Sequence, residues 1–279
     1  MSLEFPELGI TRVGLALLRE LLTERMGLHY PEDREDVLAE RLASIAIDRG
    51  FRSYLELFYL LKYDNNPADW ARVMDELSVP ETYFWREIDQ IRAVVDRVVP
   101  ALAEQAKGRP LRIWSVPCAS GEEPLTIAMV LEESGWFNRI PIELHGSDAS
   151  PAALARATDG TYRERAFRAL PASMKEKYFE PTAGGWRPIA TLRSRVQSWS
   201  VVNLLEADRA DSLTSSPVIF CRNAFIYFSA AAVRKTVDIF ASRMPRPGYL
   251  CVGASESLLN ITTAFSLKEI DGAFVYAKQ

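Results

Sequence analysis

Residues 111–134 read LRIWSVPCASGEEPLTIAMVLEES, an apolar run followed by small residues and then by a helical pattern. The run LRIWSV is typical of a buried strand, and Pro124 suits the first turn of the helix that follows. Further strands are predicted at 142–148, 198–202, 217–221 and 249–253. Because helical patterns alternate with these runs, we predict βαβ units and an α/β fold with a mostly parallel sheet.

Two segments depart from this alternation. The tail 265–279 carries Asp271-Gly272 between two alternating stretches, which predicts an antiparallel hairpin at the end of the sheet. Residues 178–200 include Gly184-Gly185, and we predict that they form a small antiparallel β insertion.

Helical patterns fill the N-terminal part of the chain. Apolar residues recur at helical spacing in 10–27, 35–50, 54–63 and 67–78. Gly27 and Gly50 stand where helix C-caps belong. We therefore predict a small all-α domain over 1–78, a linker over 79–108 whose helix is interrupted by Pro100, and an α/β domain over 109–279.

The composition excludes several classes of function. The 279 residues include 33 basic and 37 acidic ones, whereas a general nucleic-acid binder needs a basic surface. No apolar run approaches the roughly 18 residues of a membrane span, and the N-terminus has no signal-peptide pattern. The three cysteines and two histidines do not form a metal-binding pattern. We expect a cytoplasmic protein without a metal, a nucleic-acid partner or membrane insertion.

The loop 118–124, CASGEEP, lies where an open α/β sheet binds ligands, beyond the carboxyl end of a strand. Its small residues would let a ligand approach the backbone closely. Glu122 and Glu123 would repel the phosphates that such loops often bind, but they suit the ammonium and sulfonium groups of S-adenosylmethionine (SAM). Alternatively, both acids only complement the helix dipole, and the loop alone leaves the two interpretations open.

Two further groups of polar residues follow predicted strands. Asp148 could accept hydrogen bonds from both ribose hydroxyls of a nucleoside, or it could cap the next helix, although Ser150 suits that cap better. Arg222, Asn223 and Tyr227 follow the fourth predicted parallel strand, which indicates a site; the alternative is a helix start with incidental polar residues. Taken with the loop, Asp148 favours a nucleoside with a cationic tail.

The acceptor of a methyl group decides whether methyl transfer needs a base. A glutamate carboxylate has a pKa of about 4.3 in model peptides and is already ionised at neutral pH. An alcohol or an amine would usually need a positioned base, and the chain has only two histidines. The composition is therefore no obstacle to a carboxylate acceptor.

Six blocks of sequence resemble, in order and spacing, the motifs of the chemotaxis receptor methyltransferase (CheR) family. They are ETYFWRE at 81–87, WSVPCASGEEP at 114–124, GSDAS at 146–150, VNLL at 202–205, VIFCRNAFIYF at 218–228 and GASESL at 253–258. The resemblance covers nearly the whole chain. It implies a class I SAM-dependent methyltransferase domain with a Rossmann-like sheet, a small N-terminal all-α domain and a small antiparallel β insertion.

The resemblance also implies an activity and a partner. Members of the family transfer the methyl group of SAM to glutamates on the cytoplasmic helical domain of chemoreceptors in chemotaxis signalling, and they release S-adenosyl-L-homocysteine. Arg86 and Tyr227 would lie nearest the transferred methyl group, and Tyr227 would orient the acceptor carboxylate.

Cofactor contacts follow from the same motifs. Thr82 and Arg86 would reach the cofactor from the linker. Its amino-acid end would lie against Gly121 and Glu123, and its ribose against Asp148.

The remaining cofactor contacts come from two later motifs. The resemblance places Asn203 and Leu204 at the adenine, and Arg222 and Asn223 would complete the site.

Three features depart from the family pattern. Pro80 stands where asparagine is usual, and Ala254 where histidine is common. The stretch 31–49 has six acidic residues and three arginines where a basic helix face is usual, which predicts a different receptor surface or weaker docking. Two other functions stay open, a small-molecule methyltransferase on this fold and a non-catalytic SAM-binding regulator, although Arg86 and Tyr227 argue against the second.

Overall fold

The computed structural model describes residues 12–64 and 66–279, and its contacts divide the chain into two compact units. One unit holds the described residues up to Val79 together with Tyr227–Val233, and the other holds Pro80–Ile226 and Arg234–Gln279. Most of the segment 79–108 therefore lies in the second unit. Within the described residues, no helix is long and apolar enough to cross a membrane.

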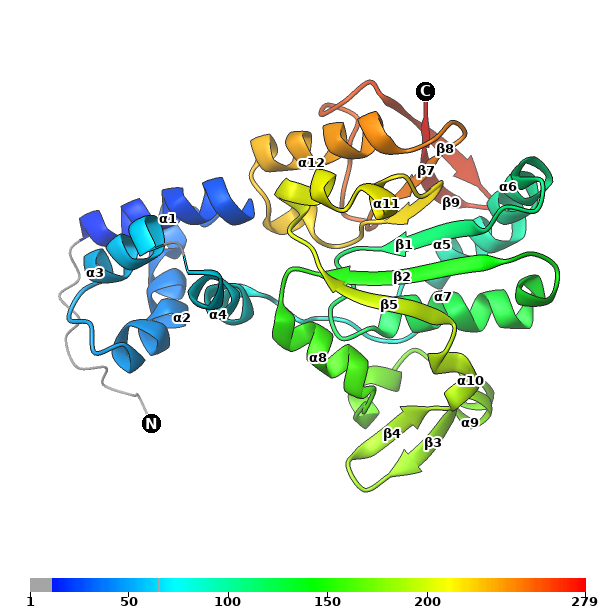
Figure 1. The fold of residues 1–279 in the computed structure, drawn as a ribbon, viewed down its shortest axis with the longest axis horizontal. Coiled ribbons are helices and arrows are strands. Elements are labelled where there is room, and N and C mark those ends of the chain that lie inside the picture. The colour runs from blue at the N-terminus through cyan, green and yellow to red at the C-terminus, as the bar shows by residue number, and fades with distance from the viewer. Residues whose placement is uncertain (1–11, 65) are drawn as a thin grey trace. The chain divides into compact units, whose positions relative to one another are not determined.

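The described part of the first unit is helical (Figure 1). Its elements are α1 Arg12–Met26, a 3₁₀ turn Glu32–Arg34, α2 Glu35–Asp48, α3 Tyr54–Tyr59, a π-helical turn Leu60–Asp64 and α4 Pro67–Leu77. Gly27 and Gly50 have positive φ angles, +79° and +71°, just beyond α1 and α2, as expected of glycines that end helices. The side chain of Asn66 caps α4 by accepting a hydrogen bond from the amide of Ala68 at 3.0 Å. Fully buried leucines join these helices, among them Leu18, Leu22, Leu38, Leu42 and Leu57.

The second unit contains a seven-stranded sheet in the order β5-β2-β1-β6-β7-β9-β8. The strands are β1 Leu111–Ser115, β2 Ile142–Asp148, β5 Val196–Val201, β6 Val218–Phe220, β7 Tyr249–Cys251, β8 Phe265–Ile270 and β9 Ala273–Lys278. β1 pairs in parallel with both β2 and β6, so the loops that follow β1 and β6 diverge at a topological switch point.

The last two strands, β8 and β9, run antiparallel to each other, and β9 runs antiparallel to β7. Asp271 and Gly272 join them with φ angles of +49° and +81°, the left-handed conformation that an Asp-Gly hairpin turn requires. The predicted fold is confirmed: one unit has a mostly parallel sheet that ends in an antiparallel pair, and the described part of the other is all-α.

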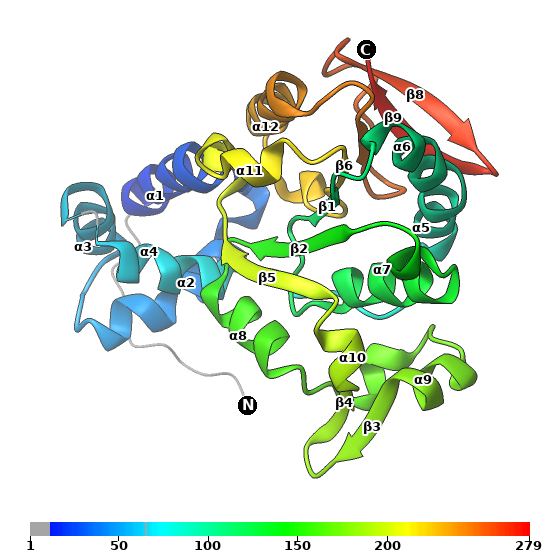
Figure 2. The same ribbon diagram turned by 45° about the vertical axis from the view of Figure 1, so that its right-hand side comes forward.

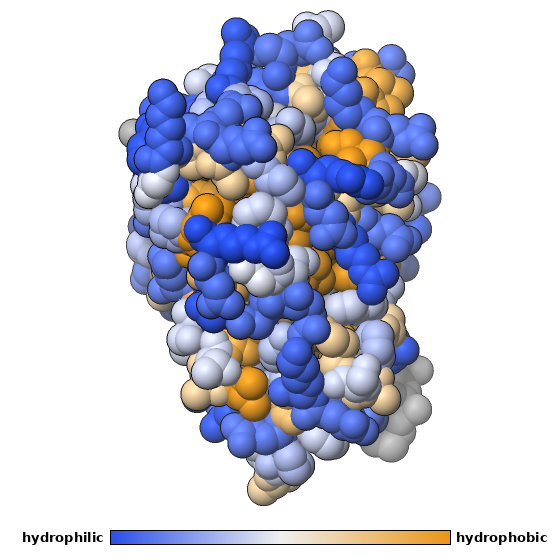
Figure 3. Space-filling model, turned by 90° about the vertical axis from the view of Figure 1, so that its right-hand side faces the viewer, coloured by the Kyte–Doolittle hydropathy of each residue, from blue (hydrophilic) through white to orange (hydrophobic). Residues whose placement is uncertain are grey.

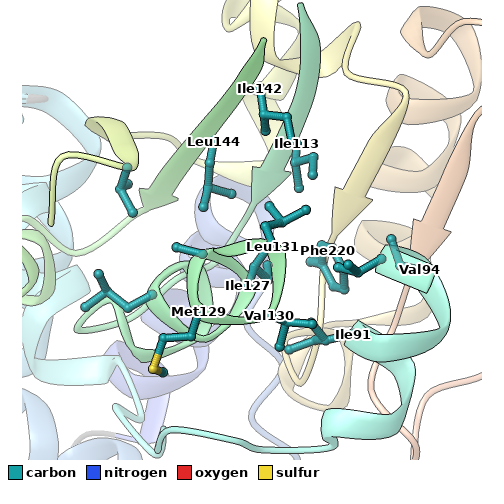
Figure 4. Packing of buried hydrophobic residues seen from close by; sticks show 14 of the residues in the cluster. Ile91, Val94, Ile113, Ile127, Met129, Val130, Leu131, Ile142, Leu144 and Phe220 are labelled. Atoms are coloured by element: carbon teal, nitrogen blue, oxygen red, sulfur yellow. The ribbon is translucent and has the colours of Figure 1, made fainter. Parts of the chain in front are cut away.

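Helices cover both faces of the sheet. The remaining α-helices are α5 Ile88–Ala93, α6 Val99–Ala106, α7 Glu122–Glu133, α8 Pro151–Asp159, α9 Ala172–Tyr178, α10 Ala190–Arg193, α11 Asp211–Thr214 and α12 Ala230–Arg243. On one face, Ile127 of α7 lies with Ile113 and Leu144 of the neighbouring strands β1 and β2 (Figure 4). On the other face, Trp114 of β1 packs edge to face on Phe240 of α12, with ring centroids 6.0 Å apart.

The helix predicted to precede the sheet is divided. α5 ends at Ala93, α6 begins at Val99, and Val94–Val98 between them form a π-helical turn. Pro100 lies in the first turn of α6 and has no N–H to donate to the preceding turn. The predicted interruption at Pro100 therefore takes the form of a π-helical turn.

A two-stranded sheet, β3 Phe179–Thr182 with β4 Gly185–Pro188, stands apart from the large sheet (Figure 2). The segment 178–200, predicted as a β insertion, holds this hairpin only as far as residue 188. Its last residues belong to β5, which pairs in parallel with β2 and forms an edge of the large sheet. The predicted insertion extends too far because β5 forms by pairing with β2, a strand about fifty residues earlier in the chain.

Hydrophilic residues dominate the face of the molecule in Figure 3, where hydrophobic residues form small separate groups. On the β8–β9 hairpin, Leu267 and Phe274 are exposed. Scattered hydrophobic exposure of this kind is ordinary for a folded protein.

Candidate cofactor site

The loop between β1 and α7 has a conformation that ordinary residues rarely adopt. Ala119 and Gly121 have φ angles of +47° and +94°. A Cβ atom at Gly121 would lie 2.9 Å from the ring of Trp199, 3.1 Å from Cβ of Ala157 and 3.2 Å from the hydroxyl of Tyr162. Only glycine therefore fits at this position without moving its neighbours.

Asp148, the last residue of β2, ties this loop to the next one. Its Oδ2 accepts a hydrogen bond from the amide of Ala119 at 2.8 Å, and its Oδ1 accepts one from the amide of Ser150 at 2.9 Å. Ser150 itself caps α8, because its hydroxyl accepts from the amide of Ala153 at 3.0 Å. Asp148 is thus not the helix cap. Burial raises the pKa of its carboxyl group, although hydrogen bonds from backbone amides lower it.

At the start of α7, Glu122 is buried and Glu123 has only 14% of its side chain exposed, unlike acids that only complement a helix dipole from the surface. The Glu122 carboxylate accepts a hydrogen bond from the Ser120 hydroxyl at 2.8 Å, and burial raises the pKa of Glu122. Glu123 accepts from the Ser115 hydroxyl at 2.7 Å. Burial also raises the pKa of Glu123, despite the opposing effect of Arg222.

Arg222 follows β6 and joins the cofactor loop to the linker. Its Nε lies 2.9 Å from a carboxylate oxygen of Glu123, an ion pair whose N–H is not aligned for a hydrogen bond. One terminal nitrogen donates to the carbonyl oxygen of Arg86 at 2.7 Å, and the other to that of Glu87 at 3.4 Å. Because the Arg222 side chain is almost fully buried, these contacts hold 86–87 against the end of β6.

The linker segment around Arg86 is anchored by a neighbouring aromatic residue. Phe84 is fully buried, and its amide donates to the carbonyl oxygen of Ala166 at 2.9 Å. Thr82 and Arg86 are half-buried on either side of it. A guanidinium N–H of Arg86 donates to the carbonyl oxygen of Glu81 at 2.8 Å.

Asn203 and Leu204 follow β5, the strand beside β2. The amide of Val202 donates to the carbonyl oxygen of Asp148 at 2.9 Å, which brings this segment to the end of β2. Asn203 caps a 3₁₀ turn, Leu204–Arg209, by accepting from the amide of Leu205 at 3.0 Å. Leu204 is buried.

Tyr227 stands outside this network of contacts. It belongs to the first unit, its side chain is partly exposed, and its carbonyl oxygen accepts a hydrogen bond from the amide of His29 at 2.8 Å. The other predicted residues lie in the second unit. Contacts within that unit join Arg86, Glu123 and Arg222 to one another.

The sequence patterns did not single out Glu256, which organises the loop that follows β6. Its carboxylate accepts backbone hydrogen bonds from Gly253 at 2.6 Å, Asn223 at 2.8 Å, Phe225 at 2.7 Å and Ile226 at 3.3 Å. Asn223 has a φ angle of +60° there. The sequence feature that could have indicated Glu256 is its position in the block GASESL, three residues after the glycine that ends a predicted strand.

The residues around the cofactor loop fit a cationic ligand. Three acidic side chains lie at this loop: Glu122 and Asp148 are buried, and Glu123 has 14% of its side chain exposed. Burial raises the pKa of the Cys118 thiol well above the usual value, and Asp148 and Glu123 act in the same direction. No cluster of potential metal ligands occurs among the described residues. The α/β fold and this acidic loop at its switch point match the class predicted from the sequence, a SAM-dependent methyltransferase.

Comparisons with known proteins identify the family. Residues 80–274 match the model described as CheR methyltransferase, SAM binding domain, and residues 14–78 match CheR methyltransferase, all-alpha domain. The chain belongs to the CheR methyltransferase family, and the resemblance predicted from the six motifs is confirmed.

Several relatives are similar over most of the chain. Chemotaxis protein methyltransferase 2 of Vibrio cholerae is 31% identical over 98% of this chain and 95% of its own. The chemotaxis protein methyltransferase of Borreliella burgdorferi is 27% identical over 90% of each chain. A probable biofilm formation methyltransferase, WspC of Pseudomonas putida, is 28% identical over 92% of this chain and 60% of its own.

Proposed function

We propose that this protein transfers the methyl group of SAM to glutamate side chains on the cytoplasmic helical domain of chemoreceptors, as an adaptation step in chemotaxis. The relatives named as chemotaxis protein methyltransferases support the receptor substrate. The observation that carries the proposal within the structure is the acidic loop 118–123, where the carboxyl groups of Glu122, Glu123 and Asp148 gather with little exposure to solvent, which suits a cationic methyl donor. The enzyme would act in the cytoplasm, where that receptor domain lies.

We assign the cofactor contacts to the residues predicted from the motifs: Thr82, Arg86, Gly121, Glu123, Asp148, Asn203, Leu204, Arg222 and Asn223. Three observations support the assignment. The loop at Gly121 has no room for a side chain, Asp148 ends β2 beside that loop, and Arg222 links Glu123 to the backbone of Arg86. Asp148→Ala should weaken SAM binding by on the order of 1–3 kcal/mol, through loss of charged hydrogen bonds.

The reaction requires little acid–base chemistry from the protein. Bound SAM supplies a methyl group on a positively charged sulfur. The acceptor carboxylate is already ionised, so no side chain has to remove a proton. His145 would be a poor base in any case, since it lies in β2 with Nδ1 2.7 Å from the Ser198 hydroxyl, and burial lowers its pKa.

We assign the orientation of the acceptor to Arg86 and Tyr227. A guanidinium has five N–H donors. A carbonyl oxygen takes one of those of Arg86, and its Nε lies 3.8 Å from the Glu87 carboxylate, which leaves further donors for an acceptor carboxylate. Tyr227 would hold the carboxylate through its hydroxyl group. Tyr227→Phe should therefore slow turnover more than it weakens SAM binding.

The test is methylation of purified receptor fragments with methyl-labelled SAM. We expect base-labile label, as a methyl ester gives, on glutamates of the fragment, and its loss when those glutamates are changed to glutamine. Label that withstands mild base, or label on small molecules alone, would contradict the proposal. The second candidate function is methylation of a receptor involved in biofilm formation, which the name of the WspC relative suggests. It is tested by including a fragment of such a receptor in the same assay.

A further inference from the structure

We propose that Tyr162 is a positioning residue that holds the cofactor loop in its binding conformation and through which the β3–β4 hairpin supports that loop. This inference rests on the proposed location of the SAM site. Tyr162 follows α8 and is buried, and it touches three parts of the second unit that are far apart in the chain: the cofactor loop, the linker and the hairpin.

The hydroxyl group of Tyr162 is bonded to the cofactor loop. It donates to the carbonyl oxygen of Ser120 at 2.8 Å. Ser120 lies between Ala119 and Gly121, whose positive φ angles turn the backbone and aim this carbonyl group at the tyrosine. The Tyr162 oxygen would also lie 3.2 Å from a Cβ atom at Gly121, so the ring and the loop are in close contact.

The ring of Tyr162 also packs on the linker that carries the proposed SAM contacts Thr82 and Arg86. It meets the ring of Phe84 edge to face, with centroids 4.8 Å apart. Phe84 is fully buried and packs on Phe167 and on Phe179 of β3 as well. One aromatic cluster therefore contacts both the linker and the cofactor loop.

The backbone of Tyr162 is clamped by the hairpin. Its amide donates to the carbonyl oxygen of Trp186 in β4, and its carbonyl oxygen accepts from the amide of Trp186, both at 2.8 Å. The next residue back, Gly185, approaches so closely that a Cβ atom there would lie 2.3 Å from the carbonyl oxygen of Tyr162. A disturbance of the hairpin at this point must therefore move Tyr162.

Tyr162 remains a donor at working pH. Burial raises the pKa of its hydroxyl group well above the usual value, and the charge of Glu122 acts in the same direction. The hydroxyl group therefore keeps the proton that it donates to the Ser120 carbonyl oxygen.

The experiment compares Tyr162→Phe with Tyr178→Phe by calorimetric titration with SAM. Both variants lose one hydroxyl group from a buried ring, but the hydroxyl of Tyr178 donates to Glu133, at the far end of α7 from the cofactor loop. We expect Tyr162→Phe to raise the Kd for SAM about five- to tenfold, the effect of one lost hydrogen bond, and Tyr178→Phe to leave it within about twofold. In turnover assays over a range of SAM concentrations, Tyr162→Phe should keep the wild-type kcat while its KM for SAM rises.

A second pair tests the role of the hairpin. Gly185→Ala forces a contact with the Tyr162 carbonyl group, whereas a Cβ atom at Gly184 would meet only a Thr161 methyl group at 3.4 Å. Gly185→Ala should raise the Kd for SAM and Gly184→Ala should not. An unchanged Kd in Tyr162→Phe, or equal changes in the two tyrosine variants, would overturn the inference. Failure of the wild-type protein to bind SAM would instead overturn the proposed cofactor site.

Discussion

Glu256→Gln should destabilise the second unit although it keeps the size of the side chain. In the wild-type protein one carboxylate oxygen accepts from the amides of Gly253 and Asn223, and the other from those of Phe225 and Ile226. Glutamine offers one oxygen and one NH₂ group, so its NH₂ group must face two amide donors. Two backbone N–H groups lose their acceptor, each at a cost of about 1–3 kcal/mol. Because Glu256 is only half-buried, we expect the lower part of that range, about 2–4 kcal/mol in total.

Urea unfolding at neutral pH measures this loss as a shift of the midpoint at constant slope. The control is Glu269→Gln on β8, where the side chain is exposed and the change should stay within about 0.5 kcal/mol. Asn223 lies on the loop that Glu256 holds, so SAM binding should weaken too. A midpoint for Glu256→Gln that matches the control would refute the view that the carboxylate organises this loop.

Three further outcomes are expected. Gly27→Ala should destabilise the first unit by about 1 kcal/mol more than Gly50→Ala in thermal unfolding. Both positions have a positive φ angle, but of the two only a Cβ atom at Gly27 would meet a neighbour, at 3.0 Å. Equal losses would contradict the packing argument. Burial raises the pKa of Glu122, so the wild-type fold loses stability as the pH rises through the pKa that Glu122 has in the folded protein. Glutamine does not titrate, and Glu122→Gln should therefore gain stability relative to wild type between mildly acidic and neutral pH. Urea unfolding at both pH values measures the difference, and the opposite trend would refute this. Gly146→Ala should cost about 1–3 kcal/mol in urea unfolding, since its Cβ would lie 2.5 Å from the Trp199 ring, and an unchanged midpoint would show that the ring moves freely.

The parts of the fold that the sequence predicted well depend on residues close together in the chain. Asp271-Gly272 turns the final hairpin because its left-handed φ angles are a local property. Ser150 caps α8 for the same reason, since a cap bonds an amide three residues ahead. The extent of the β insertion was harder to predict, because β5 is assigned to the large sheet only by its pairing with β2. A strand's own residues carry little information about which partner it takes.

The candidate site also combines features that the sequence shows with features that only the folded structure shows. The small residues of the loop 118–121 and the acids after it are visible in the chain, and they point to a cationic ligand without any coordinates. The role of each acid is not visible. Glu123 meets Arg222, about a hundred residues away, whereas its neighbour Glu122 bonds Ser120 within the loop. Adjacent acids therefore have different partners, which only packing decides.

The sequence by itself determined the order of helices and strands, the anionic character of the cofactor loop and, through its motifs, the CheR family. Only the tertiary structure decided that Glu256 organises the loop after β6 and that Tyr162 joins the cofactor loop to the hairpin. The physical reason is the range of the forces involved. Backbone conformation and amphipathic periodicity follow from neighbours a few residues apart, whereas a buried carboxylate or hydroxyl group must find partners among whatever segments the folded chain brings beside it.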